Sequence, residues 1–205
     1  ETVTGSKYLL EEDGTKILID CGLFQGLKEL RLRNWDPFAV SPNEIDAVLL
    51  THAHLDHSGY LPLLVKQGFK GPIYATKATC DLVEILLRDA GRIQEEDAAR
   101  ANRYGYSKHK PAKPLYTEEE AIRSLKQLSP IEFGQDYPLS YDFVFNAKRA
   151  GHILGSAILT VRTPRTTLVF SGDLGRPNSF IMRDPAQIQT ADYLVMESTY
   201  GARSH

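Results

Sequence analysis

The chain has 205 residues, of which 42% are hydrophobic and 24% are charged, a composition that is ordinary for a soluble globular domain with a sizeable core. The net charge of -2 excludes a general electrostatic attraction to nucleic acid or membranes, so any contact with a polyanion must come from a local patch. No stretch is long and apolar enough to cross a membrane, and no signal-peptide pattern is present, so we expect no membrane partner. The two cysteines lack CxxC spacing, which argues against a thiolate metal site and predicts a cytoplasmic location.

The first part of the chain predicts a hairpin followed by buried strands. The predicted strands here are residues 7–10, 16–19, 46–50 and 73–75. The first two flank Asp13-Gly14, which is a preferred pair for a tight turn. Weak periodicity over residues 23–44 indicates a loop with a short helical piece, and a helix is expected to begin near Ser58.

Two further helices and a strand-rich end are expected. A helix from Lys77 to about Tyr104 has apolar residues at helical spacing, namely Leu82, Ile85, Leu86, Ala90 and Ile93. A capping-box pattern at Thr117 opens a second helix through about Leu128, closed by Pro130. Later strands are predicted at 143–147, 157–161, 167–170 and 193–196, the last one buried. This order favours a mixed α/β layer structure with sheets packed between helices.

Four potential metal ligands follow the predicted strand at 46–50 within six positions. In extended backbone, residues i and i+2 point to the same side, so His52 and His54 can face one metal ion. Asp56 and His57 turn away at the mouth of the next helix and can face a second. Imidazole and carboxylate suit zinc in a hydrolytic site. A structural histidine would explain one such residue but not four, because each buried polar group needs its own partner.

Other polar residues share one position, just past the end of an apolar strand. They are Asp20, His152, Asp173 and Glu197. Strand ends at one edge of a sheet converge, so these residues can form one site with the histidine cluster. Asp173 can bridge two metal ions, and the alternative is a turn-forming Asp beside glycine. Asp20 suits acceptance of the free ring N–H of a ligand histidine, and the alternative is a helix or turn cap.

A basic and aromatic segment runs from Arg100 to Tyr116 without an acidic residue. Its members are Arg100, Arg103, Tyr104, Tyr106, Lys108, His109, Lys110, Lys113 and Tyr116. Basic side chains can hold RNA phosphates while tyrosines stack on bases. The alternative is a solvated loop between helices, and it is slightly favoured because Glu95-Glu96-Asp97 just upstream offsets the charge.

Four motifs in this order resemble those of the metallo-β-lactamase superfamily: Asp20, the HxHxDH run from His52 to His57, His152 and Asp173. The run alone is fairly specific, and the ordered set is highly specific. The segment Glu197-Ser198-Thr199-Tyr200-Gly201 resembles the first signature of the β-CASP branch of RNA- and DNA-processing nucleases. This resemblance implies an αββα sandwich with the site at one edge of its two sheets.

The resemblance also implies a dinuclear zinc centre that hydrolyses RNA phosphodiester bonds. The implied ligands are His52, His54 and His152 for one zinc ion, Asp56 and His57 for the other, and Asp173 between the two. Asp56, Asp173 and Glu197 would be catalytic, with Glu197 orienting a general-acid histidine. Zinc would lower the pKa of the attacking water. Single-stranded RNA is the expected substrate and endonucleolytic cleavage the expected mode, while a homodimer stays open.

The implied boundaries place the metallo-β-lactamase part at residues 1–197 and the start of a connection to a β-CASP domain at 198–205. Because further family histidines would follow His205, we expect this piece alone to be weak or inactive. Two alternatives remain. A thioesterase-like or glyoxalase II-like hydrolase of the same fold would not need the segment at Glu197. A non-catalytic scaffold of an RNA-processing complex should have lost metal ligands.

Overall fold

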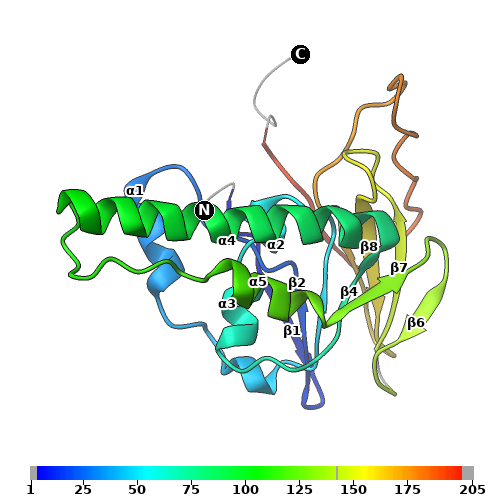
Figure 1. Ribbon diagram of the computed structural model, residues 1–205. Coiled ribbons are helices and arrows are strands. Elements are labelled where there is room, and N and C mark those ends of the chain that lie inside the picture. Colours follow the sequence, from blue (N-terminus) through cyan, green and yellow to red (C-terminus); the bar gives the residue numbers. More distant parts are fainter. Residues whose placement is uncertain (1–3, 142, 200–205) are drawn as a thin grey trace.

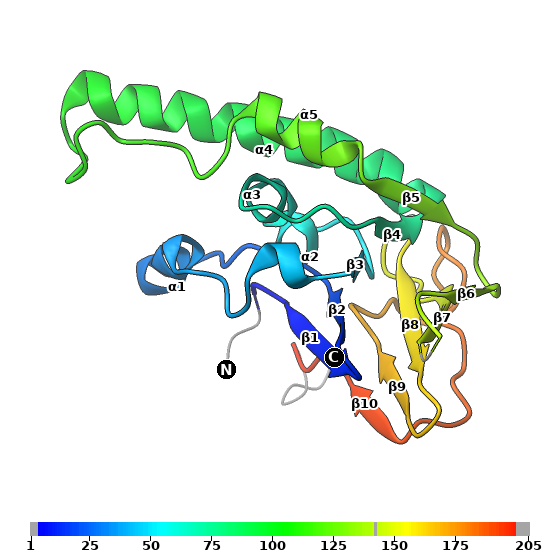
Figure 2. The same ribbon diagram turned by 90° about the horizontal axis from the view of Figure 1, so that it is seen from below.

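The computed structural model describes residues 4–141 and 143–199 and forms two five-stranded sheets that face each other (Figures 1 and 2). The first sheet has the order β1 (Tyr8–Glu12), β2 (Thr15–Ile19), β3 (Ala47–Leu49), β4 (Ile73–Thr76), β5 (Leu128–Ile131). The second has the order β10 (Tyr193–Val195), β9 (Thr167–Phe170), β8 (Ala157–Arg162), β7 (Val144–Arg149), β6 (Asp136–Pro138). Both sheets are mixed, because β1 runs antiparallel to β2 in one and β10 runs parallel to β9 in the other.

The helices are α1 (Lys28–Leu32), α2 (Leu55–Ser58), α3 (Leu61–Lys66), α4 (Lys77–Tyr104) and α5 (Glu118–Leu125), with 3-10 turns η1 (Arg33–Trp35) and η2 (Pro42–Glu44). Figure 2 shows α4 and α5 as the outermost layer over the first sheet, with α3 beneath them. None of the helices in the described residues has the length and apolarity that a membrane span needs. The hairpin, the loop with a short helical piece and the long helix ending before Gly105 are confirmed.

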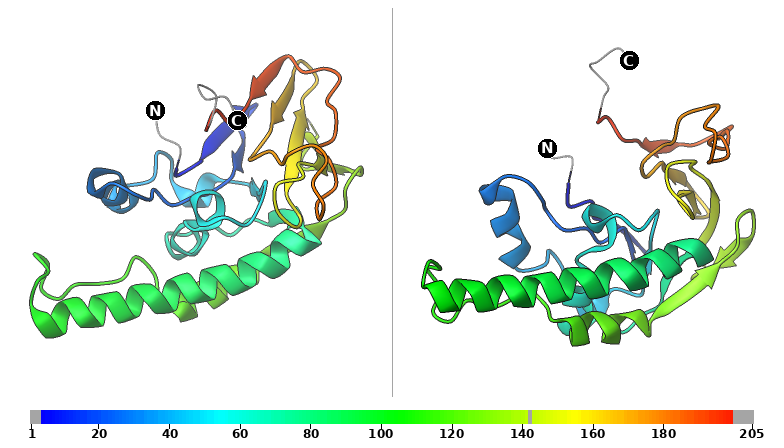
Figure 3. Two further views of the ribbon diagram at one scale, coloured as in Figure 1. Left: turned by 90° about the horizontal axis from the view of Figure 1, so that it is seen from above. Right: turned by 45° about the horizontal axis from the view of Figure 1, so that its top comes forward.

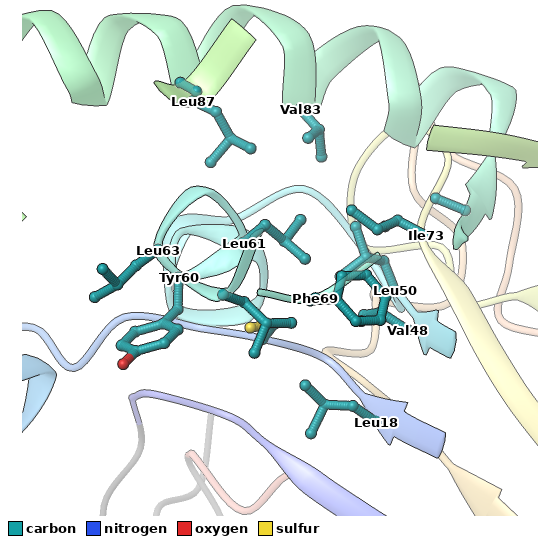
Figure 4. Close-up of a cluster of buried hydrophobic side chains, with 14 of the residues drawn as sticks. Leu18, Val48, Leu50, Tyr60, Leu61, Leu63, Phe69, Ile73, Val83 and Leu87 are labelled. Atoms are coloured by element: carbon teal, nitrogen blue, oxygen red, sulfur yellow. The ribbon is translucent and has the colours of Figure 1, made fainter. Parts of the chain in front are cut away.

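Strand β3 is buried on both faces because it separates two cores. Ala47 and Leu49 belong to the core between the sheets, which also contains Phe145 of the second sheet. Val48 and Leu50 belong to the core between the first sheet and the helices (Figure 4). This explains why the run is continuously apolar rather than alternating. It also places the histidine cluster, which follows β3, at one end of both cores.

The outer face of the second sheet is covered by irregular chain. Leu174 and Ile188, from the segment between β9 and β10, pack against Ala150, Ile158 and Val169. The predicted α/β fold class is confirmed in its paired sheets and in the helical layer on the first sheet. In the described residues, the helices all precede β5 in the chain.

The apolar spacing in α4 correctly predicts the helix but gives only part of its buried face, and two expectations about other elements are wrong. In α4, Ile85 and Ile93 are exposed, and the buried face follows Val83, Leu87 and Ala90, because these three residues belong to the core that α4 shares with α5. Pro130 does not close a helix: α5 ends at Leu125 and Pro130 lies within β5.

Proline is tolerated there because β5 is the edge strand of its sheet and needs no ladder hydrogen bond on its open side. Strand β10 is likewise an edge strand, and its first two side chains are exposed rather than buried, with 65% of Tyr193 and 57% of Leu194 accessible, while Val195 is partly buried. The short strand β6 has no counterpart in the expectations. Tyr200, Gly201 and His205 lie outside the described residues.

Candidate metal centre

The histidine cluster is held in place by hydrogen bonds between two loops. The loop after β2 binds the backbone of α2, because Cys21 N donates to His57 O at 2.7 Å and Leu23 N donates to Leu55 O at 2.8 Å. Helix α2 therefore begins at Leu55, three residues before the expected start. His57 and Asp56 lie in this single turn, and their side chains leave the strand direction of β3 as the sequence predicts.

Three imidazoles and one carboxylate converge at this edge of the sheets. His52, His54, His152 and Asp173 each offer a ligand atom, and these atoms all lie within 4.8 Å of one another. The Nε2 atom of His52 lies 3.1 Å from Nδ1 of His54, which lies 3.2 Å from Nε2 of His152. The Oδ2 atom of Asp173 lies 3.6 Å from His52 Nε2 and 3.4 Å from His152 Nε2.

The donor chemistry of this group fits a metal ion. Burial lowers the pKa of His52 to about 2 and also lowers the pKa of His54, so both rings are neutral at physiological pH. Neutral imidazoles present lone pairs, and three ring nitrogens that face one point cannot all be satisfied by donating to each other. A cation at the centre satisfies them together. Three nitrogens and one carboxylate oxygen match the donor set of tetrahedral zinc.

Asp173 faces a second set of ligands with its other oxygen. Its Oδ1 atom lies 3.3 Å from Nε2 of His57, and Oδ2 of Asp56 lies 3.9 Å from that same nitrogen. Although burial alone would raise it, the hydrogen bond from His57 and the neighbouring rings lower the pKa of Asp173 to about 2. The carboxylate is therefore ionised and presents one oxygen to each group of histidines, the geometry that a bridging ligand requires.

Asp20 anchors His57 from behind. Its Oδ2 atom lies 2.7 Å from Nδ1 of His57, and it also accepts from the Thr51 hydroxyl at 2.8 Å, while Oδ1 accepts from Thr51 N at 2.8 Å. The residue is 1% exposed and has a left-handed backbone with φ of 56°. Such strain in a residue other than glycine is typical of functional sites. The Nδ1–Asp20 contact leaves Nε2 of His57 facing Asp56 and Asp173.

The loops that carry His152 and Asp173 approach each other very closely. A Cβ atom on Gly175 would lie 1.8 Å from the carbonyl oxygen of Gly151, so only glycine fits. Gly175 N donates to Ala150 O at 2.8 Å across the same contact. This backbone pairing fixes the two ligand loops relative to each other.

Glu197 holds the Asp173 loop from its other side. Its Oε1 atom accepts from Leu174 N at 2.5 Å, and its Oε2 atom accepts from the hydroxyl of Thr199 at 3.1 Å. Its own amide donates to Ser171 Oγ at 3.1 Å. The structure thus brings Glu197 to the edge of the cluster, where its carboxylate positions the loop that follows Asp173.

Several residues of the site carry no role in the sequence analysis. The hydroxyl of Thr51 lies 3.0 Å from Nδ1 of His52 as well as binding Asp20, and Ser156 Oγ accepts from His152 N at 3.0 Å. Thr51 directly precedes the HxHxDH run, so its place beside the ligands was a usable signal. Ser156 and Ser171 act through backbone contacts, which leave no pattern in the sequence.

The basic segment around Arg100 to Lys110 lies far from this centre. Helix α4 begins beside the His152 loop, where Thr76 Oγ1 donates to Gly155 O at 2.7 Å. Its 28 residues span about 42 Å at 1.5 Å per residue, and Figure 3 shows the far end projecting beyond the sheets. Tyr104 and Tyr106 are exposed, but Tyr116 is 0% exposed and belongs to the core, so it cannot stack on a base.

A cavity of about 930 Å³ opens beside the ligands. His152, Asp173 and Glu197 contribute to its wall, and the rest comes from the loops around residues 174–182 and 198–199. A smaller cavity of about 120 Å³ reaches Asp20 and His57 from the other side of Asp173. The arrangement can hold one or more metal ions at the floor of an open hollow that admits a substrate from solvent.

Comparison with known proteins gives a consistent result. The family model described as "Metallo-beta-lactamase superfamily" matches residues 3–136. Over 204 residues, 99% of the chain, the sequence is 42% identical to "Ribonuclease TTHA0252" of Thermus thermophilus. It is 33% identical over 192 residues, 92% of the chain, to "Transcription termination factor FttA" of Methanocaldococcus jannaschii. Among solved structures, the metallo-β-lactamase fold protein YhfI of Bacillus subtilis is similar over 87% of this chain and 58% of its own, with a TM-score of 0.51 and 18% identity.

The chain spans only part of these relatives. It covers 42% of the length of the Thermus thermophilus protein and 28% of the length of the Methanocaldococcus jannaschii protein. The similarity therefore concerns the two sheets and the ligand cluster described above.

Proposed function

This chain belongs to the metallo-β-lactamase superfamily, and from that premise we propose that its full-length protein is a zinc-dependent ribonuclease that cleaves single-stranded RNA internally. The resemblance drawn from the HxHxDH run and its companion motifs is confirmed, since homology to "Ribonuclease TTHA0252" runs over 99% of the chain. The observation that carries the proposal is the carboxylate of Asp173. It turns one oxygen to His52 and His152 and the other to His57.

We assign the ligands in two groups around that carboxylate. His52, His54 and His152 would hold one zinc ion, Asp56 and His57 would hold the second, and Asp173 would bridge them. Bound zinc would supply acidified water and would stabilise negative charge on the phosphoryl oxygens.

The protein residues then have separate tasks. Asp173 sets the spacing of the two ligand groups, and Asp20 keeps the Nε2 atom of His57 directed at the site. Glu197 fixes the loop after Asp173 through Leu174 N and lies at the wall of the cavity, where it can orient an acid for the leaving oxygen. Each of these tasks depends on a contact that the described residues already make.

RNA is favoured as the substrate over a thioester or lactam. The relative with 42% identity is named a ribonuclease, and the segment at Glu197 takes part in the site through Leu174. A non-catalytic scaffold is disfavoured, because the residues that would hold metal are present and converge. We propose this function for the full-length protein, because the chain covers 42% of the length of that relative.

A direct test compares two substrates with the full-length protein. We expect cleavage of a labelled single-stranded RNA and no hydrolysis of a small thioester. His54→Ala should lower the RNA cleavage rate on the order of 100-fold or more, because it removes one of the three histidines proposed to hold the first zinc ion. His109→Ala is the matched control, because His109 is exposed and lies just beyond the far end of α4. This variant should cleave RNA at the wild-type rate. Thioester hydrolysis without RNA cleavage would establish the alternative hydrolase.

A further inference from the structure

The segment between β9 and β10 presents a bare aromatic ring to solvent. The side chain of Phe180 is fully accessible, and 91% of the neighbouring Ile181 is accessible. This segment is orange in Figure 1. A single exposed apolar residue needs no explanation. Phe180 differs because of where its segment leads.

Phe180 borders the same hollow as the metal ligands. Arg176 and Phe180 line the cavity of about 930 Å³ together with His152 and Asp173. A polymer that placed a phosphate at the ligands would pass over this wall. The ring of Phe180 therefore lies on a path that a substrate strand takes and not on an unrelated face.

The segment is tied to the ligand loops at both of its ends. Gly175 N donates to Ala150 O at 2.8 Å, and Ala186 N donates to Arg149 O at 2.8 Å. Both acceptors lie just before His152. These bonds attach the base of the segment to the loop that carries His152.

Hydrogen bonds also close the tip itself. Asn178 N donates to Oδ1 of Asp184 at 2.8 Å, and Met182 N donates to Oγ of Ser179 at 3.2 Å. Asn178 adopts a left-handed backbone with φ of 61°, which turns the chain before Phe180. The ring is thus presented from a turn that is held by hydrogen bonds. Binding a ligand to it costs little conformational entropy, because the turn is already ordered.

Charge on the segment is suited to a polyanion. Arg176 lines the cavity, and neither Arg176 nor Arg183 forms an ion pair within the part of the chain that the structure describes. A guanidinium without a carboxylate partner is available to a phosphate. An aromatic ring flanked by free guanidinium groups is the combination that binds single-stranded nucleic acid through stacking and backbone contacts.

We propose that Phe180 stacks on a base of the RNA strand next to the scissile phosphate and that Arg176 contacts a neighbouring phosphate. This inference rests on the proposed ribonuclease function and names a substrate-binding residue for it. Stacking tolerates any base, since every base has a π-face. The wall would therefore select unpaired RNA over a duplex without imposing a sequence.

The test uses the full-length protein and a labelled single-stranded RNA. Phe180→Ala should raise KM roughly 5- to 100-fold with kcat changed by less than about twofold, because one base loses its stacking partner. Phe180→Trp should keep the wild-type KM. Tyr141→Ala is the matched control, since this ring is also fully exposed but lies in the turn between β6 and β7. A series of RNAs, each with one abasic nucleotide at a different position, extends the test. The abasic nucleotide should raise the KM of the wild type at one position only, and should leave the KM of Phe180→Ala unchanged there.

The outcomes separate this inference from the function on which it rests. Wild-type cleavage with an unchanged KM for Phe180→Ala overturns the stacking contact and leaves the ribonuclease intact. A lowered melting temperature of Phe180→Ala with unchanged KM also overturns it, because the rest of the protein would then cover the ring. Absence of RNA cleavage by the wild type refutes the proposed function itself.

Discussion

Asp20 determines which nitrogen of His57 faces the site. A carboxylate only accepts hydrogen bonds, so the 2.7 Å contact requires a proton on Nδ1 of His57 and leaves Nε2 to Asp56 and Asp173. In Asp20→Asn the new amide can donate to Nδ1 and move the ring proton to Nε2. We predict an affinity for the second zinc ion about 10- to 100-fold lower, measured by zinc titration of the full-length protein.

The first zinc ion should bind Asp20→Asn as tightly as the wild type. Asp46→Asn is a suitable control, because Asp46 also accepts a backbone amide, that of Lys16, but lies away from the cluster. Equal affinity of both sites in Asp20→Asn and in the wild type would show that the carboxylate does not set the tautomer.

The charge of His57 predicts how the metal-free protein responds to pH. Burial disfavours the charged ring, but Asp20 and Asp173 outweigh it and raise the pKa of His57 from 6.5 to about 10. A raised pKa means that the charged ring stabilises the fold fully below pH 6.5 and that this contribution is lost as pH rises from 6.5 to about 10. We expect the melting temperature in chelator to fall across this range, and His57→Gln to flatten the fall.

The melting temperatures of the wild type and His57→Gln are best compared up to about pH 9. Above the ordinary Cys pKa of 9.0, burial of the Cys21 thiol, which raises its pKa to about 12, adds a loss of the same sign. A melting temperature that stays constant or rises between pH 6.5 and about 9 in the metal-free wild type would contradict the raised pKa.

At the scale of elements, the ligand loops depend on the close contact between Gly175 and Gly151. In Gly175→Ala the new Cβ would meet the Gly151 carbonyl oxygen at 1.8 Å, so one loop must move. Because His152 and Asp173 sit on these loops, we predict reduced metal content and a destabilisation of several kcal/mol. Elemental analysis and thermal unfolding measure the two effects.

The matched control for this prediction is Gly134→Ala. Gly134 has a left-handed φ of 78° but nothing within 4 Å of its Cβ position, so alanine there costs only backbone strain, about 1 kcal/mol. Normal metal content in Gly175→Ala would show that the ligand loops tolerate separation.

The elements that the sequence predicted correctly are those determined by local pattern. Asp13-Gly14 specifies its turn, and the apolar run before His52 specifies β3. The errors concern tertiary context. Pro130 is acceptable only because β5 is an edge strand, and Tyr193 is exposed only because β10 is the last strand of its sheet. Neither edge is encoded in a window of neighbouring residues.

The same division applies to the site. The HxHxDH run, His152 and Asp173 are predicted as ligands because their residue types and positions after strands are visible in sequence. The structure brings His52, His54, His152 and Asp173 together, with His57 and Asp56 beside Asp173 and His57 respectively. The contact of Glu197 with Leu174 N was not predictable, because it depends on β10 lying beside β9. The distance of Arg100 from the cluster follows from the direction of α4, which periodicity does not give.

At the level of the whole molecule, the candidate metal ligands lie at one edge of the two sheets. Asp20 follows β2, the histidine run follows β3, Asp173 follows β9 and Glu197 follows β10, so four strand ends from both sheets contribute. The core between the sheets fixes their relative position, because Ile19 and Leu49 of the first sheet share it with Phe145 of the second. The metal centre is therefore a property of the sheet pair as well as of one motif.

RNA cleavage by the full-length protein, measured before and after removal of metal, decides whether the histidine cluster is a catalytic metal centre. We predict that chelation abolishes cleavage of a labelled single-stranded RNA and that added zinc restores it in the wild type. His152→Ala should not recover, since His152 is the proposed ligand from the loop after β7, and its Nε2 atom lies 3.2 Å from Nδ1 of His54. RNA cleavage that persists in a protein shown by elemental analysis to be free of metal would contradict the account.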